Sequence, residues 1–451
     1  MKKLAAVFFT LLFASTASAQ VITSPSTNAR MDGMGVANWQ IEDDFNIWIN
    51  PAQISNYKNN IYGELGIYHA SSQTDNTSGL TSSISSPNQN GVASGSEWGG
   101  MNMDVSYGEW GVYIGRPYTA AINSTGQSIG AAPLGISSFG LSGPLNMMNQ
   151  TGGSGSNPNN NRVDLFYGLH SAQPMGLYLS YADQYTKNTN AAGVSGKDEA
   201  TEWNLGAGGI FGGGVIDGAV DVTLPSSKCS STTAALAACG NTFKSDAGPS
   251  VALLGRYHAN MGNSKLLTTG QIMYIDASTK GTGAAYTKVD DTTLGWRIDT
   301  ALNSKPIPDA LVVVGIGLAG SNREAKFNNG QGKVTLDNLA IPVNVAIEHQ
   351  TLKSLKTRFG LSKPLYNSSN CKDTNGASNC PITLFGTGAL EKSNTVSDGA
   401  ATASVGLGWA VMDNFSIDAV INQDILFSGT YMISGVSETL SSKLSATYRF
   451  K

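Results

Sequence analysis

Charged side chains are scarce in this sequence of 451 residues, where they make up only 13% of the total. Ordinary soluble domains carry about 25% charged residues. The formal net charge is −4, which gives no sign of the basic surface that nucleic-acid binding requires. The composition therefore argues against a nucleic-acid partner and against a chain of ordinary soluble domains.

Long hydrophobic runs are equally scarce. The only clear one, residues 4–14, follows two lysines and precedes the small residues of segment 17–19. A membrane-spanning helix needs about 20 apolar residues, so we interpret residues 1–19 as a secretory signal peptide. The one other structure that satisfies all backbone N–H and C=O groups in lipid is a closed β-barrel.

The remaining chain shows the alternation that a barrel requires. Met101, Met103 and Val105 alternate with Asn102 and Asp104, and the same period of two recurs through much of the chain beyond residue 59. Alternation of this kind places apolar side chains on one face of a strand and polar ones on the other. The pattern predicts an all-β fold over residues 59–451, a transmembrane antiparallel up-and-down barrel.

The connections between the alternating segments give the number of strands. Seven of them are short and rich in Gly, Pro, Asn and Asp, as hairpin turns are: YGEWG, HSAQPMG, FGGGV, NMGNSK, SKPIPDA, HQTLKS and VMDNF. Eight longer polar segments lie between them, including 71–98, 120–161, 227–248 and 367–399. These connections predict sixteen strands. Fourteen remain an alternative, because segments 279–290 and 321–338 could be loops or strand extensions.

Aromatic residues near the strand ends favour a membrane barrel over a soluble β-sandwich. A sandwich would bury its apolar faces, whereas outer-membrane barrels carry aromatic girdles at both membrane interfaces. We therefore expect the protein in the outer membrane of a Gram-negative bacterium, in contact with the lipid bilayer. The residues expected in the girdles are Tyr107, Trp110, Tyr113, Tyr178, Tyr181, Trp296, Trp409 and Phe450.

Within the predicted hatch, residues 20–58, the stretch 24–58 lacks alternation and precedes the first clear strand. Pro51 cannot donate a backbone hydrogen bond and disfavours a helical conformation at Asn50. Irregular backbone at membrane depth is tolerated where protein or water satisfies it, so the segment suits the inside of a barrel. We expect a hatch that plugs the lumen, and a periplasmic leader is the alternative.

The hatch segment reads NARMDGMGVANWQIEDDFNIWINPAQISN over residues 28–56. It resembles the N-terminal hatch of the long-chain fatty-acid transporter family. The resemblance covers about forty residues and rests on a Gly-rich turn, a pair of acids and an Asn-Pro-Ala triplet. In this sequence they are Gly33, Gly35, Asp43, Asp44, Asn50, Pro51 and Ala52.

The polar strand faces carry many charges, whereas fatty-acid transporters line part of their lumen with apolar side chains. Sixteen strands leave an aqueous channel in known porins, so these charges predict a wet lumen. Pairs of opposite sign could sort solutes by charge. Alternatively, they pair across neighbouring strands and only fill the lumen. The inward charges are expected to be Asp104, Arg162, Asp164, Glu202, Asp217, Asp221, Arg297, Asp299, Glu348, Lys356, Arg358, Asp418, Asp424, Lys443 and Arg449.

Three functions remain open at this stage, and the first is the one we expect. It is a porin for passive diffusion of small hydrophilic solutes or ions. Loop 120–161 is its candidate constriction, although an exposed surface loop or a landing site for a lipid-like substrate is the alternative. By resemblance, sixteen-stranded porins often form homotrimers. The second is a plugged barrel, similar to fatty-acid transporters, that takes up hydrophobic compounds. The third is a structural or assembly barrel that binds another protein.

The four cysteines fall into two local pairs, Cys229 with Cys239 and Cys371 with Cys380, each in a predicted outer loop. Local pairing closes the shortest loops, and an oxidising exterior favours disulfides. The spacings match no common zinc framework, and no histidine is near. We expect two disulfides and no metal.

Signals of enzymatic activity are weak, and we expect neither catalysis nor a cofactor. The chain lacks a G-x-S-x-G motif, and its four histidines fall near predicted strand ends, where we expect solvated or interfacial side chains. Gly315, Gly317 and Gly320 match the spacing of a dinucleotide fingerprint, but a polar loop follows them where the motif needs a helix.

The last segment, SSKLSATYRFK, has one apolar and one polar face. It resembles the closing strand of outer-membrane barrels, which commonly ends in an aromatic residue that the barrel assembly machinery recognises. Phe450 fits this role, although Lys451 follows it and departs from the pattern.

We expect deletion of Phe450 and Lys451 together to lower the yield of folded protein in the outer membrane, because the assembly signal would be lost. Heat-modifiable migration on gels of outer-membrane fractions measures this yield. A yield equal to that of the intact chain would contradict the role of Phe450.

Overall fold

The computed structural model describes residues 28–66, 97–116, 121–122, 128–129, 162–169, 171–189, 195–231, 243–281, 288–328, 332–373, 402–421 and 441–450. Several predictions lie outside these residues: the signal peptide 1–19, most of loop 120–161, Asp424, Cys239 and Cys380. The disulfides and the constriction loop therefore stay predictions.

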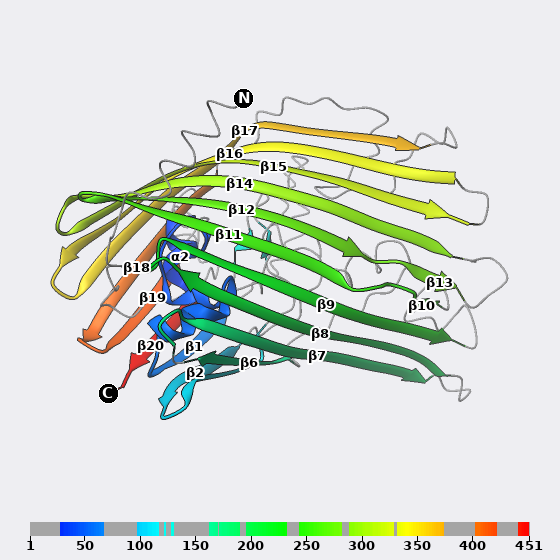
Figure 1. The fold of residues 1–451 in the computed structure, drawn as a ribbon, viewed down its shortest axis with the longest axis horizontal. Coiled ribbons are helices and arrows are strands. Elements are labelled where there is room, and N and C mark those ends of the chain that lie inside the picture. Colours follow the sequence, from blue (N-terminus) through cyan, green and yellow to red (C-terminus); the bar gives the residue numbers. More distant parts are fainter. Residues whose placement is uncertain are drawn as a thin grey trace, which may run out of the picture.

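The sheet closes on itself to form a barrel (Figure 1). Its sixteen main strands, counted over the described residues, are β1 (Asn60–Gly66), β2 (Trp98–Val105), β3 (Gly108–Ile114), β6 (Arg162–Leu169), β7 (Met175–Thr189), β8 (Ser195–Phe211), β9 (Ile216–Ser231), β11 (Ser250–Met261), β12 (Ser264–Asp276), β14 (Val289–Ile307), β15 (Ala310–Phe327), β16 (Gly332–Leu352), β17 (Leu355–Asp373), β18 (Thr402–Met412), β19 (Phe415–Ile421) and β20 (Ser441–Arg449). Each pairs antiparallel with the next. Ile61 on β1 lies opposite Met101 on β2 and Tyr448 on β20, so the first strand joins the last and no edge remains open.

Four shorter strands accompany the barrel. β10 (Phe243–Ser245) pairs with β9 and β13 (Thr279–Gly281), and β13 also pairs with β14. β4 (Ala121–Ile122) and β5 (Ser128–Ile129) form a separate pair. Segments 321–327 and 332–338 belong to β15 and β16, so they are strand extensions and the alternative of fourteen strands is wrong.

The seven predicted turns are all confirmed, since each joins two consecutive strands of the barrel. The turn between β8 and β9 shows why its sequence is Gly-rich. Gly212, Gly213 and Gly214 have φ angles of 60°, 67° and 94°, in the left-handed region that glycine adopts without steric cost. Turns of this kind need residues that can be recognised in the sequence, so counting the turns predicts the number of strands.

The outer face of the barrel is apolar. Leu294 and Ile298 on β14 and Phe359 on β17 are each more than half exposed. Side chains that face lipid are exposed in this way when the chain is considered without its bilayer. Strands β14–β17 contain 18 to 21 residues. A membrane strand needs about 9–11 residues, so this side of the wall extends beyond the bilayer.

The hatch lies inside the barrel. It contains helix α2 (Asn28–Met34) and two 3-10 helices, η1 (Asp44–Trp48) and η2 (Pro51–Asn56), drawn in blue within the wall (Figure 1). α2 contacts strands β16 to β20, whereas η2 contacts β3, β6, β7 and β8 on the other side of the lumen. The hatch therefore crosses the lumen, near the end that carries the short turns and faces the periplasm.

In the part of the chain that the structure describes, no helix is long and apolar enough to cross a membrane.

The girdle prediction is wrong for two aromatic residues. Tyr113 and Tyr178 are only 3% and 4% exposed and face the hatch inside the barrel. Their strand neighbours Val112 and Leu177 face outward instead. The lumen in this sector is apolar because the hatch packs against it, a feature that a purely aqueous channel would not have.

Glycines form notches in the inner wall where the hatch backbone approaches it. A Cβ atom at Gly360 on β17 would collide with the backbone of Met34. A Cβ at Gly406 on β18 would lie 2.8 Å from Cα of Gly33, and one at Gly176 on β7 would collide with the backbone of Pro51. Backbone atoms cannot yield as flexible side chains do, so these positions require glycine for close packing.

We expect Gly360→Ala to weaken docking of the hatch by about 1–3 kcal/mol, the usual cost of overpacking. The hatch should then become sensitive to added protease, which mass spectrometry of the released peptides would detect. Gly255→Ala is the matched control, because a Cβ there would meet no atom within 4 Å. Equal protease resistance of the two variants would contradict tight docking at Gly360.

Candidate functional site

The Asn-Pro-Ala triplet starts the 3-10 helix η2. Asn50 Oδ1 accepts a hydrogen bond from the backbone N–H of Ala52 at 3.0 Å, and Asn50 Nδ2 donates to the carbonyl of Gly209 on β8 at 3.1 Å. Pro51 occupies the first helical position, where a missing N–H costs nothing. The triplet thus caps a helix and attaches it to the wall.

The paired acids have separate roles. Asp43 caps η1: its Oδ1 accepts from the backbone N–H of Phe45 at 3.1 Å, while the side chain of Asn46 accepts from the backbone N–H of Asp43. Asp44 faces the wall, where its Oδ2 lies 3.5 Å from Nη2 of Arg449 on β20. The acids and the triplet that were predicted in the hatch therefore cap its helices or contact the wall.

A first anchor of the hatch is a chain of buried ion pairs. Arg30 donates to Asp43 Oδ2 at 2.7 Å and to both oxygens of Glu348 on β16, at 2.8 and 2.9 Å. Arg358 on β17 donates to Glu348 at 2.6 Å and to Asp418 on β19 at 2.5 Å. Removing one member of such a buried group typically costs about 3–5 kcal/mol.

A second anchor joins the hatch to β9, β11 and β12. Gln53 Nε2 donates to Asp217 Oδ2 at 2.5 Å, and Arg256 holds the same carboxylate through two hydrogen bonds. His258 lies between this carboxylate and Glu42, with Nε2 3.4 Å from Asp217 Oδ2 and Nδ1 3.2 Å from Glu42 Oε1. The expectation of a solvated histidine is wrong here, since His258 is 5% exposed.

Two wall side chains stabilise the ionised carboxylate of Glu42. Lys265 on β12 also forms an ion pair with its carboxylate. Burial opposes ionisation, but the hydrogen bond with His258 and the charge of Lys265 outweigh it and lower the pKa of Glu42 to about 2. Glu42 therefore stabilises the docked hatch at neutral pH.

A third anchor joins α2 to β20, and it favours docking of the hatch less than the other two do. Lys443 Nζ on β20 donates to Asp32 Oδ2 at 2.5 Å and lies 3.5 Å from Glu64 Oε1 on β1. Burial raises the pKa of Asp32 to about 6; the ion pair with Lys443 lowers it, and the nearby charge of Glu64 raises it further. One lysine thus serves two acids, and ionised Asp32 opposes docking.

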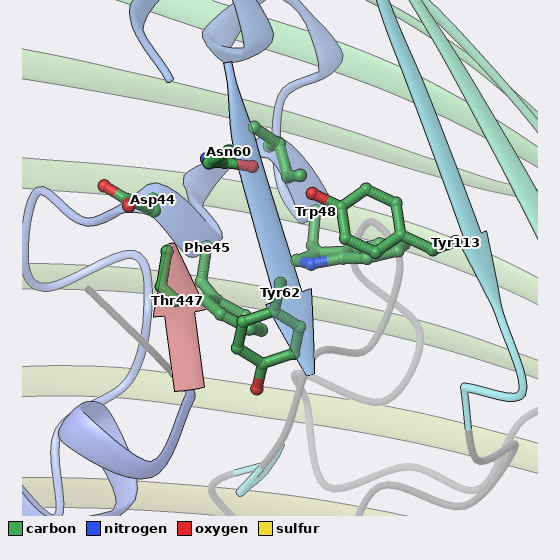
Figure 2. A pocket seen from close by; sticks show the side chains of 8 residues that line it. Asp44, Phe45, Trp48, Asn60, Tyr62, Tyr113 and Thr447 are labelled. Carbon is green, nitrogen blue, oxygen red and sulfur yellow. The ribbon is translucent and has the colours of Figure 1, made fainter. Parts of the chain in front are cut away.

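Aromatic side chains pack where the hatch meets β1, β2 and β3. Phe45 contacts Tyr62 edge-on, with ring centroids 4.9 Å apart, and Trp98 at 6.0 Å. A cavity of about 10 Å³ lies beside them, lined by Trp48 and Asn60 among others (Figure 2). A cavity of this size holds about one water molecule, so the docked hatch leaves no space for a larger solute there.

Many of the predicted lumen charges are engaged in ion pairs. Arg162 lies 3.2 Å from Asp164 and 3.7 Å from Glu202, and Arg116, which sequence reasoning did not single out, donates to both oxygens of Asp164 at 2.9 Å. Arg116 lies two residues beyond the end of β3, where the alternation ends, so the pattern carries no signal for it. The alternative of charges that pair and fill the lumen therefore describes this group.

Other predicted charges are also placed. Arg297 and Asp299 pair on β14, and Arg297 lies 4.6 Å over the ring of Trp39 in the hatch. Asp104 pairs with Lys58 at 2.6 Å near the turn end, where both are more exposed. Lys356 on β17 is half-buried near the first anchor.

Asp217, Asp221, Asp418 and Lys443, which were also expected to face inward, are buried or half-buried on the lumen side of their strands. Phe450 lies just beyond β20, and its backbone N–H donates to the carbonyl of Asn59 at 2.8 Å. This contact fastens the chain end to the start of β1.

No protein-family model matches the sequence. No curated protein matches it either.

Three solved structures illustrate the similarity of fold. A FadL homologue of Pseudomonas aeruginosa is 11% identical with a TM-score of 0.39, over 95% of this chain and 99% of that chain. The mutant monoaromatic hydrocarbon channel TodX is 10% identical with a TM-score of 0.37, over 94% and 99%. FpvAI in its complex with pyocin S2 is 11% identical with a TM-score of 0.34, over 58% and 39%, so this chain spans less than half of that protein.

A closed antiparallel barrel with an apolar outer wall and a polar, filled interior suits one environment. The protein is a β-barrel of the Gram-negative outer membrane with an N-terminal hatch in its lumen.

Asp32 predicts a pH dependence of docking. Its pKa is about 6 in the docked hatch and 3.8 ordinarily, so the docked state binds the proton more tightly. Docking should strengthen as the pH falls from 7.5 to 5, by about 1 kcal/mol. Hydrogen exchange of the α2 amides measures this change.

The Asp32→Asn variant is the control, since it should lose this pH dependence. Glu42 does not interfere much, because both its docked pKa of about 2 and its ordinary value of 4.5 lie below this range. An unchanged pH dependence in Asp32→Asn would show that another group titrates.

Proposed function

We propose that this protein is a hatch-closed channel that takes up hydrophobic compounds across the outer membrane. The observation that carries the proposal is the position of the hatch. It crosses the lumen from α2 to η2, and the side chains of its residues 29–54 are nearly all buried. Transport through such a barrel requires the hatch to move.

The expectation of a passive porin has less support than the hatch-closed channel. A passive porin needs an open lumen with charges exposed to water. Here Asp164 and Arg358 are each at most 4% exposed and engaged by neighbouring side chains. Nothing in the described residues favours the third candidate, a structural or assembly barrel.

The character of the inner wall supports an apolar solute. Tyr62, Trp98, Tyr113, Phe166 and Tyr178 form one apolar sector of the wall, and the hatch covers it. If the hatch withdrew, this sector would line the path to the periplasm. Apolar surface in a path favours solutes that are themselves poorly hydrated.

We expect intact protein in planar bilayers to show little conductance, because the hatch fills the lumen. Arg30→Ala should raise the frequency of open events at least about tenfold, since removing one partner of a buried ion group costs several kcal/mol. Removing residues 20–58 should give a large, stable conductance.

Lys58→Ala is the matched control, because Lys58 forms an exposed ion pair with Asp104 that contributes at most about 1 kcal/mol. It should behave like intact protein. A large open conductance in the intact protein would sink the proposal and restore the passive porin.

A further inference from the structure

Trp48 of the hatch is inserted among aromatic side chains of the wall. Its ring centroid lies 5.8 Å from Trp98, 5.0 Å from Tyr113, 4.9 Å from Phe166 and 6.3 Å from Tyr178. All four pairs are edge-to-face, with interplanar angles of 65° to 83°. This is the geometry that aromatic rings prefer, and it defines a slot for a flat ring.

A guanidinium group lies over Trp48 as well. Cζ of Arg116 is 4.3 Å from the ring centroid, which is the geometry of a cation–π contact. Arg116 is 1% exposed, so little water screens this contact. We call Arg116 and the four wall rings the aromatic slot.

The slot is held together without Trp48. Among the wall rings, Phe166 lies 4.8 Å from Tyr178 and 5.9 Å from Tyr113, and Trp98 lies 6.1 Å from Tyr113. These contacts lie between wall residues and involve no residue of the hatch.

Hydrogen bonds orient the polar ends of the slot from behind. Tyr178 donates to Asp164 Oδ1 at 2.7 Å, and Arg116 donates to Tyr178 at 3.0 Å and to both oxygens of Asp164. Tyr113 donates to Asn102 at 3.1 Å. None of these bonds involves Trp48, so the slot is preorganised for a ring and would keep its shape if the hatch withdrew.

We propose that the aromatic slot is a ligand site for flat, electron-rich aromatic compounds of one or two rings, which Trp48 occupies in the closed state. The inference rests on the proposed function, since the ligand reaches the slot when the hatch moves. Trp48 then acts as an internal competitor, and its departure exposes the site.

The chemistry of the slot selects aromatic over aliphatic ligands. A cation over a ring face is attracted by the π electrons, which a saturated ring lacks. In addition, Nε1 of Trp98 is buried and has no hydrogen-bond partner among the described residues. A ligand that placed an acceptor atom within reach would satisfy this donor.

The test is calorimetric titration of the full-length Trp48→Ala variant in detergent with indole as the probe. We expect one saturable site. Cyclohexanol should bind at least about tenfold more weakly, because it lacks the cation–π and edge-to-face contacts. Trp110→Ala removes a lipid-facing ring instead and should show no indole site, which corrects for partition into detergent.

A second substitution tests the slot itself. Adding Arg116→Gln to Trp48→Ala should weaken indole binding about tenfold, while heat-modifiable migration confirms the fold. If that protein does not fold, Phe166→Leu in its place should weaken binding about threefold or more. Equal affinity for indole and cyclohexanol, no saturable binding, or no effect of the slot substitution would overturn the inference. The conductance of Arg30→Ala is independent of these results and would still support the hatch-closed channel.

Discussion

A buried charge must have a partner, and in this barrel that constraint links the wall to the hatch. The inner wall carries acids and arginines that lie out of water, where an unpaired charge costs several kcal/mol. The hatch contributes Arg30 to Glu348 and Glu42 to Lys265, while the wall returns Lys443 to Asp32. The hatch is therefore part of the electrostatic balance of the lumen as well as a plug.

Several wall charges would keep a partner on the wall if the hatch left. Glu348 would keep Arg358 after Arg30 departed, Asp217 would keep Arg256, and Glu64 would keep Lys443. The wall is thus internally compensated at these positions, whereas Lys265 relies on Glu42 of the hatch. Docking depends on a surplus of favourable contacts, from which the buried Asp32 subtracts at neutral pH.

The sequence predicts the barrel well because strand period and turn chemistry are local properties. Alternation placed Arg162 and Asp164 inside, and the Gly-rich and Pro-containing joins gave sixteen strands. The interior was harder, because a period of two says which face a side chain is on and nothing about what lies opposite. Tyr113 illustrates this: its strand neighbours Trp110 and Val112 already assign it to the inner face, yet its residue type suggested lipid. Where the hatch packs against the inner wall, apolar side chains are favoured on a face that is polar in an open channel.

Closure and release make opposite demands on the hatch surface, and two kinds of contact meet them. Sixteen strands enclose a lumen wide enough for water, so a plug must match the wall closely to prevent leakage. Glycine notches such as Gly360 allow backbone to approach backbone, which excludes water through shape. Such contacts reform whenever the surfaces meet, because they need no covalent bond. Aromatic contacts around Trp48 are different, since another flat ring can replace them, and this gives the ligand a means to compete with closure.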